Sequence, residues 1–205
     1  FIATPEECDW TQSVDVNLEF TDNGGSGFHS FKYAVSDTQA EPTDWNEPNT
    51  NNPGTVTITE EGKKFLHIKG TDKDGNESFD RVLGQYYIDH SGPNIEVTGD
   101  MESIVIDQLD LNLNVTDPFS GLKKVSINGQ DVKNGTITFQ KNGEYVIQAE
   151  DNIGNISSKT LNITNIYYEC NAGLERPIYS SDYDEGPICE SIKGLRIREG
   201  GDKIY

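Results

Sequence analysis

A pattern that occurs twice in the same order is the feature that most limits what this chain can fold into. The first copy has the segments Phe20-Thr-Asp22, Ser26-Gly27 and Asp72-Lys-Asp-Gly75-Asn76. The second copy has Val115-Thr-Asp117, Ser120-Gly121 and Asp151-Asn-Ile-Gly154-Asn155. Polar turns at matching places between strand-like runs predict two homologous β modules in tandem. Such arrays space or bind other molecules, so the repeat does not indicate a catalyst.

Alternation of apolar and polar residues predicts the strands of both copies. Val14, Val16, Leu18 and Phe20 alternate with Asp15, Asn17 and Glu19, and residues 109–115 repeat the pattern. This period of two is typical of half-buried strands. Further strands are expected at 28–35, 55–59, 63–71 and 79–89, and at 94–98, 103–106, 122–127, 136–140, 144–150 and 157–165. Asn-Gly pairs at 128–129, 134–135 and 142–143 predict hairpin turns, because both residue types tolerate positive φ.

The sequence is therefore expected to be all-β, with two tandem sandwich domains and a short C-terminal β or loop segment. The predicted division is 1–93, 94–167 and 168–205, with Gly92-Pro93 as a short connector. Residues 36–54 contain three prolines and no alternation, which predicts a long loop in the first domain. The segment 168–205 matches neither copy. It is either a small cap closed by a disulfide or the start of a further domain.

Composition limits the partners and the compartment. The 35 acidic and 16 basic residues give a net charge of −19, which repels nucleic-acid phosphates and anionic lipid headgroups. We therefore expect no nucleic-acid partner. We also expect no membrane insertion, because no apolar run approaches the roughly 20 residues of a membrane span. The chain begins at Phe1, which we interpret as the start of a piece of a longer exported protein.

Three cysteines are too few for a disulfide scaffold and lack the spacing of a metal site. A bridge between Cys170 and Cys189 is the expected pair. In an oxidising compartment it would stabilise the tail by about 3 kcal/mol. Cys8 is interpreted as a structural or mispaired thiol.

The shared turns have a structural and a metal-binding interpretation. Asp22 and Asp117 are expected to accept hydrogen bonds from backbone N–H groups two residues on, with left-handed glycines after them. Asp72 and Asp74, with Asn76 and Ser78, resemble the start of an EF-hand loop. However, Glu77 stands where that loop needs Gly. We favour turn geometry and predict no metal site; if a cation does bind, Asp72, Asp74 and Asp22 are its expected ligands.

The run from Lys64 through Asp72-Lys-Asp-Gly-Asn to Tyr87-Ile-Asp89-His-Ser-Gly-Pro93, with Tyr33 and Trp45 before it, resembles the immunoglobulin-like repeats of bacterial cell-surface proteins. These repeats are related in architecture to fibronectin type III modules. The resemblance covers about residues 10–166. It implies an extracellular or secreted location and a role in spacing, adhesion or support of a neighbouring domain.

Enzymatic interpretations find little support in the sequence. His29, His67 and His90 fall near or within predicted strands and show no arrangement with a nucleophile, and no catalytic or phosphate-binding motif is present. We expect no catalytic residue and no cofactor. Trp45 in the 36–54 loop is either a core residue or a platform on which a glycan stacks.

These expectations combine into one functional prediction. The chain is predicted to be a non-enzymatic spacer or adhesion segment of an exported bacterial protein, with a protein or glycan partner at the cell surface. The neighbouring domains of its parent chain are the other expected partners. The alternative is a carbohydrate-binding accessory region of a secreted hydrolase.

Overall fold

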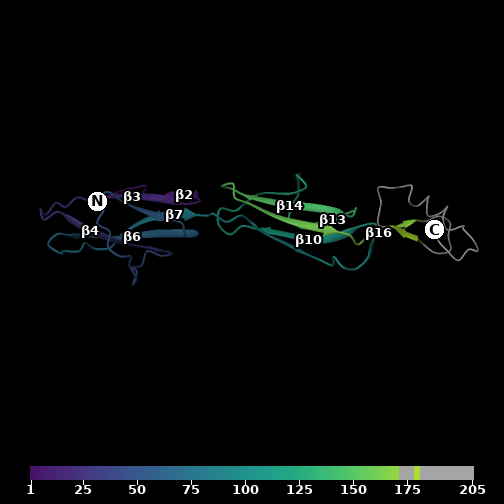
Figure 1. Ribbon diagram of the computed structural model, residues 1–205, viewed down its shortest axis with the longest axis horizontal. Helices are drawn as coiled ribbons and strands as arrows, with labels where there is room; N and C mark the ends of the chain where they lie inside the picture. Colours follow the sequence, from purple (N-terminus) through teal and green to yellow (C-terminus); the bar gives the residue numbers. More distant parts are fainter. Residues whose placement is uncertain (171–177, 181–205) are drawn as a thin grey trace, which may run out of the picture. The chain divides into compact units, whose positions relative to one another are not determined.

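The computed structural model describes residues 1–170 and 178–180, and every regular element in these residues is a β-strand (Figure 1). The all-β prediction is thus confirmed for the described part of the chain. Contacts between residues divide the chain into two compact units. Unit 1 comprises Phe1–Ser91, Pro118–Gly121 and Asn152–Asn155. Unit 2 comprises Gly92–Asp117, Leu122–Asp151 and the chain from Ile156 onward.

Unit 1 is a sandwich of two sheets. The smaller sheet has the order β1 (Ile2–Thr4), β3 (Val14–Glu19), β5 (Gly54–Ile58). The larger sheet has the order β2 (Cys8–Thr11), β7 (Arg81–Ile88), β6 (Gly62–Asp72), β4 (Phe28–Ser36). All paired strands are antiparallel except β2 and β7, which run parallel. Two mainly antiparallel sheets, packed face to face, form an immunoglobulin-like fold.

The core of unit 1 forms because alternating strands from both sheets turn their apolar sides inward. Val16 and Leu18 of β3 are fully buried, whereas the residues between them face solvent. Leu66 and Ile68 of β6 and Ile88 of β7 belong to the same buried cluster. Because one continuous apolar cluster joins the two sheets, removal of apolar surface from water stabilises both of them together.

Unit 2 repeats the strand order of the smaller sheet and of three strands of the larger sheet, and the fourth strand of its larger sheet lies at the opposite edge. Its smaller sheet is β8 (Asn94–Thr98), β10 (Leu109–Thr116) and β13 (Gly135–Phe139), with β10 in the centre. Its larger sheet has the order β12 (Gln130–Asp131), β11 (Leu122–Ile127), β14 (Gly143–Asp151), β15 (Ile156–Ile163). A third, small sheet contains β9 (Val105–Ile106), β16 (Ile166–Cys170) and β17 (Ile178–Ser180).

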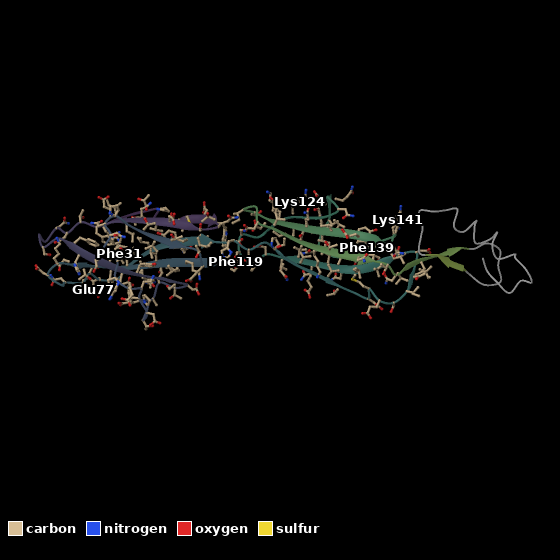
Figure 2. All side chains as sticks on the ribbon, in the orientation of Figure 1. Phe31, Glu77, Phe119, Lys124, Phe139 and Lys141 are labelled. Carbon is tan, nitrogen blue, oxygen red and sulfur yellow. The ribbon has the colours of Figure 1, made fainter. Side chains whose placement is uncertain are left out.

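A separate apolar cluster forms the core of unit 2. Leu111 and Leu113 of β10 are buried against Ile147 of β14 and Ile163 of β15. Figure 2 labels Phe139 in this sandwich and Phe31 in that of unit 1, and both rings are buried in their own cores. Each unit therefore has the apolar interior that a sandwich domain requires. The predicted boundaries 1–93, 94–167 and 168–205 remain a prediction.

Most predicted strands occur within a few residues of their expected bounds, and five short strands of the described residues were missed. The missed strands are β1, β2, β12, β16 and β17, which are only two to five residues long. Runs this short show too little alternation of apolar and polar residues for a strand to be predicted. The expected loop at 36–54 is largely irregular, with a single bridge from Asn49 to Phe31.

Only one of the three Asn-Gly pairs forms the expected two-residue hairpin. Asn128 and Gly129 both have positive φ, 47° and 81°, between the paired strands β11 and β12. The prediction for 134–135 and 142–143 was wrong, because there the Asn side chain binds another segment. Asn134 pairs with the backbone of Val115, and Asn142 with the backbone of Ile166.

Unit 1 contains the same arrangement, an Asn side chain that binds both the N–H and the carbonyl of one distant residue, which we call the Asn clamp. Asn52 Oδ1 accepts the N–H of Phe20 at 2.9 Å, and Asn52 Nδ2 donates to the Phe20 carbonyl at 2.7 Å. Asn134 makes both bonds to Val115 in unit 2, each at 2.8 Å. Phe20 and Val115 each stand two residues before the repeated Asp, so the clamp is a shared device for ending the strand.

The cysteines are described only in part. Cys189 and the side chain of Cys170 lie outside the described residues, so their pairing remains a prediction. Cys8 is a free, partly buried thiol on β2. Its burial raises the pKa of the thiol, which keeps it in the less reactive neutral form.

Candidate functional site

A recess in unit 1 has an aromatic floor. The Phe20 ring stacks on Phe28 and Phe31, with centroid distances of 5.0 and 4.9 Å, and Phe1 lies 5.3 Å from Phe20. Phe31 needs a glycine opposite it: a Cβ on Gly54 would lie 2.5 Å from the Phe31 ring. Close packing therefore fixes this cluster at the end of the sandwich where β3 ends and β4 begins.

One side of the recess is the turn that follows β3. The Asp22 carboxylate accepts N–H groups from Gly24 at 2.7 Å and Gly27 at 2.6 Å, and Gly27 has a φ of +90°. The sequence predicted this use of Asp22 and this left-handed glycine. The two backbone donors hold the pKa of Asp22 below its ordinary value, since they favour the ionised form.

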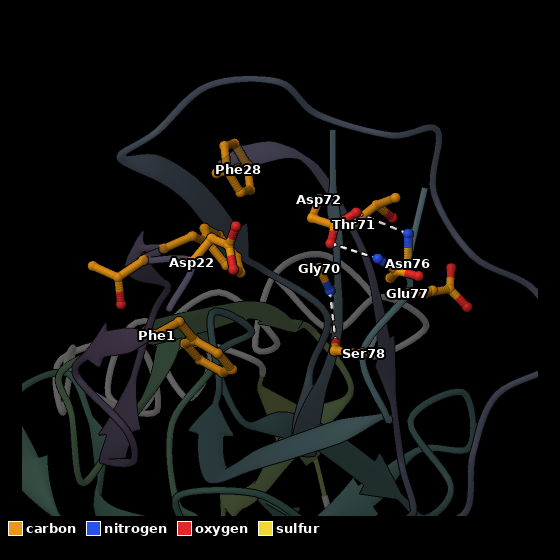
Figure 3. Close-up of a pocket in the computed structure, with 11 residues that line it drawn as sticks. Phe1, Asp22, Phe28, Gly70, Thr71, Asp72, Asn76, Glu77 and Ser78 are labelled. Atoms are coloured by element: carbon orange, nitrogen blue, oxygen red, sulfur yellow. Dashed lines mark hydrogen bonds between the residues drawn. The ribbon is translucent and has the colours of Figure 1, made fainter. Parts of the chain in front are cut away.

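The opposite side is the turn between β6 and β7. Asp72 accepts the backbone N–H and the side-chain amide of Asn76, both at 2.8 Å, and these bonds lower the pKa of Asp72. The Asn76 amide therefore folds back onto Asp72. The Ser78 hydroxyl accepts the N–H of Gly70 at 2.9 Å (Figure 3).

The resulting recess encloses about 330 Å³ and combines apolar and anionic walls. Phe1, Phe20 and Phe28 provide the apolar surface, and Asp22 and Asp72 lie at its edge (Figure 3). Glu77 also lines it, but its carboxylate is paired with Lys32 at 2.6 Å. Two ionised carboxylates beside aromatic rings suit a small group that is cationic at one end and apolar at the other.

The expected ligands of a cation at the first turn do not converge in the structure. Within the described part of the chain, Asp22, Asp72 and Asp74 do not bring three carboxylate oxygens within 4.8 Å of one another. The oxygens of Asp22 and Asp72 instead accept backbone N–H groups of their own turns. These side chains fix turn geometry, which is the interpretation that the sequence favoured.

Trp45 is neither a core residue nor an open platform. Its indole N–H donates to the Pro42 carbonyl at 3.1 Å. The ammonium groups of Lys32 and Lys69 lie 5.3 and 5.1 Å from its ring centroid. Lys32 and Lys69 are cross-strand partners on β4 and β6. The indole therefore packs over two lysine side chains on this sheet, outside the buried cluster.

His67 is fully buried on β6 and lies between a serine and an aspartate. Its Nε2 is 3.1 Å from Ser36 Oγ, and its Nδ1 is 2.7 Å from Asp80 Oδ2. The sequence analysis found no nucleophile with this histidine, because the three residues are far apart in the chain. The strand pairing of β4 with β6 brings Ser36 close to it. The distances are those of a Ser-His-Asp triad.

The protons of this group do not fit a catalytic role. His67 Nε2 also faces the Thr38 carbonyl at 3.0 Å, and a carbonyl only accepts, so Nε2 must carry a hydrogen. The Ser36 hydroxyl donates to the same carbonyl. A general base at Nε2 would need the reverse, a bare nitrogen that accepts the serine proton. The contacts of His67 with Ser36 and Thr38 instead attach the start of the 36–54 loop to β6.

No protein-family profile matches the chain, and no curated protein matches it. Among solved structures, the fibronectin(III)-like modules of Clostridium thermocellum CbhA match with a TM-score of 0.32 and 14% identity, over 85% of this chain and 96% of that chain. Murine CEACAM1b matches with a TM-score of 0.29 and 14% identity, over 80% of this chain and 97% of that one. Because both scores are low, the immunoglobulin-like description rests on the strand order and the two-sheet packing.

The described residues contain no helix that is long and apolar enough to cross a membrane.

Proposed function

We propose that this chain is a non-enzymatic spacer or adhesion segment of an exported bacterial protein. The observation that carries the proposal is the repeated sandwich, in which two units each have their own apolar core and share the strand order of the smaller sheet and of three strands of the larger sheet. Modules of this kind hold other domains at a distance or present a surface for binding. The net charge of −19 is compatible with it, since a high net charge keeps a module soluble.

Two findings weigh against competing functions. In the Ser36–His67–Asp80 group, His67 Nε2 carries a hydrogen toward the Thr38 carbonyl and cannot accept the Ser36 proton. The group therefore supports no hydrolytic step. The glycan-binding alternative depended on Trp45. Its indole N–H donates to the Pro42 carbonyl, and its ring lies against the side chains of two lysines. We therefore favour the spacer or adhesion role over a carbohydrate-binding accessory region.

The recess of Figure 3 favours a specific mode of adhesion. Its carboxylates and phenylalanine rings are suited to a lysine or arginine side chain on a partner protein. We expect lysine amide and arginine amide to shift the backbone NMR signals of Gly70 and Thr71. The variant Asp72→Asn, which keeps an acceptor for its turn, should weaken the shifts. Equal shifts throughout the chain, or no shifts, would count against this site.

The spacer or adhesion role is tested in the parent protein. Antibodies against this chain should label intact source cells or the culture medium, and deletion of the chain should reduce adhesion or the reach of the neighbouring domain. The neighbouring domain should keep its own activity. Labelling that appears only after lysis would reject an exported location, and sugar binding that disappears in Trp45→Ala would favour the alternative.

A further inference from the structure

Unit 2 has a groove between one edge of its smaller sheet and one edge of its larger sheet. The groove encloses about 540 Å³ and lies between β13 on one side and β11 and β12 on the other. Its apolar lining consists of Ile127, Val132, Ile137, Phe139 and Tyr145. Ile137 and Phe139 belong to the buried core, and the other three pack against it as partly buried side chains. An apolar side chain that enters this groove therefore extends the core of unit 2.

The strand that borders this groove has an open side. β13 lies at the edge of the smaller sheet, and β10 is its only strand neighbour among the described residues (Figure 1). Alternate residues of such an edge strand direct their N–H and C=O groups away from that neighbour. The strand Gly135-Thr-Ile-Thr-Phe139 contains no charged residue and no proline, which are the usual means of protecting an edge. β13 can therefore pair with one further strand.

Unit 1 covers the corresponding region with its own chain. There the long connection from β4 to β5 pairs with the edge of β4: the backbones of Phe31 and Asn49 exchange two hydrogen bonds, at 2.8 and 2.7 Å. The Asn46 N–H also donates to the Tyr33 carbonyl at 2.9 Å. In unit 2 the connection from β11 to β13 is shorter, and its only strand, β12, has two residues. This shorter connection leaves the groove beside β13 open.

The groove is held in shape along its length. Before β13 begins, the Val132 N–H donates to the backbone of β11 at 3.0 Å, and the Asn134 clamp binds the backbone of β10. Near the end of β13, the rings of Phe139 and Tyr145 lie 4.5 Å apart, and the Tyr145 hydroxyl donates to the Lys141 carbonyl at 2.9 Å. A groove fixed in this way needs little rearrangement to receive a ligand, which favours binding.

The charge of the groove is opposite to that of the chain as a whole. Lys133 is the only charged residue in its lining, and no carboxylate lines it. In the described part of the chain Lys133 forms no ion pair, whereas Lys123 and Lys124 of the adjacent β11 each pair with an acid. A ligand with a carboxylate therefore complements this groove. A second copy of the chain is a poor occupant, because both copies carry a net charge of −19 and repel each other.

We propose that this groove binds an extended segment of a partner protein, which adds to the smaller sheet as a fourth strand beside β13. The backbone of the segment pairs with the open side of β13, its alternate apolar side chains enter the groove, and a glutamate pairs with Lys133. In strand addition, main-chain hydrogen bonds provide affinity and such pockets provide specificity. The partner segment is thus acidic and β-prone, unlike the basic group that suits the recess of unit 1.

The test uses the whole chain and a synthetic peptide, acetyl-Glu-Val-Thr-Val-Thr-Val-Thr-amide. The peptide should shift the backbone NMR signals of residues 135–139 and slow hydrogen exchange at alternate amides among them by about tenfold or more. Two further peptides carry N-methyl groups on alternate amides, one peptide for each edge of the strand. One should bind and the other should not, because only one edge faces β13. The signals of Gly70 and Thr71 should stay unchanged, which separates this site from the recess of unit 1.

Charge reversal provides a matched control. Lys133→Glu should weaken binding of the glutamate peptide by about fivefold or more and strengthen binding of a peptide with lysine in place of its glutamate. Lys159→Glu, at an exposed position on β15 at the opposite edge of the larger sheet, should change neither. The proposal is overturned if the peptide moves no signal of β13, or if the two N-methylated peptides behave alike. It is also overturned if the chain alone dimerises, with a concentration-dependent mass and slowed exchange at 135–139 in the absence of peptide.

Discussion

At the scale of single residues, the buried polar side chain of His67 holds two segments of unit 1 together. It is fully buried between Asp80 and Thr38. Periodicity predicts which side chains face inward, but the partners of a buried polar group come from distant parts of the chain.

Loss of His67 should destabilise unit 1. His67→Ala leaves the largely buried Asp80 without its partner, so we expect a loss of about 2–4 kcal/mol in the free energy of unfolding. Urea denaturation measures it. His29→Ala, at an exposed position, serves as the control. A value near zero for His67→Ala would mean that the bonds to Asp80 and Thr38 do not persist in solution.

Trp45 should matter for stability and not for sugar binding. Trp45→Ala removes the stacking on Lys32 and Lys69, which predicts a loss of about 1–3 kcal/mol. The matched control is Phe79→Ala, because Phe79 is 97% exposed and its removal should change stability by less than about 0.5 kcal/mol. Equal effects of the two substitutions in thermal unfolding would contradict the packing role.

At the scale of elements, the repeated sequence motifs were interpreted correctly in part. The Asp22 turn and the left-handed Gly27, Gly75, Gly121 and Gly154 follow from residue chemistry alone. Asn134 and Asn142 were mistaken for hairpin residues, because an Asn before Gly fits both a hairpin and a side-chain clamp. The choice between them depends on which backbone lies beside the side chain.

The Asn clamp can be separated into its two hydrogen bonds. Asn52→Ala should cost about 1–2 kcal/mol and speed hydrogen exchange at the Phe20 amide. Asn52→Asp keeps the acceptor for Phe20 N–H but loses the donor, so it should protect that amide more than alanine does. Asn134→Ala should have the same effect at Val115. Unchanged exchange in the alanine variants would refute the clamp.

The two Asp turns should make unit 1 sensitive to acid. Folding lowers the pKa of Asp22 and of Asp72, so the unfolded chain binds more protons than the folded one at low pH. Their contribution is complete above the unfolded pKa of about 4 and is lost as pH falls through the lower folded values. Melting temperatures measured against pH should therefore fall less steeply below about pH 4 in Asp22→Asn/Asp72→Asn than in the natural chain.

At the scale of the whole molecule, the sequence predicted the class of fold well. The alternating runs 14–20 and 109–115 became the central strands β3 and β10 of the two smaller sheets, because alternation determines which face is buried. The recess of Figure 3 was not predicted. It requires Phe1 to meet Phe20 and Phe28, a contact that no local pattern encodes.

The central claim is that two separate apolar cores stabilise two sandwiches, and a matched pair of cavities tests it most directly. Leu18 and Leu113 occupy equivalent buried positions on β3 and β10. Hydrogen exchange should show that Leu18→Ala weakens protection in β6 and β7, and that Leu113→Ala weakens it in β14 and β15, each by about 2–5 kcal/mol. Equal loss of protection throughout the chain from either substitution would contradict two cores.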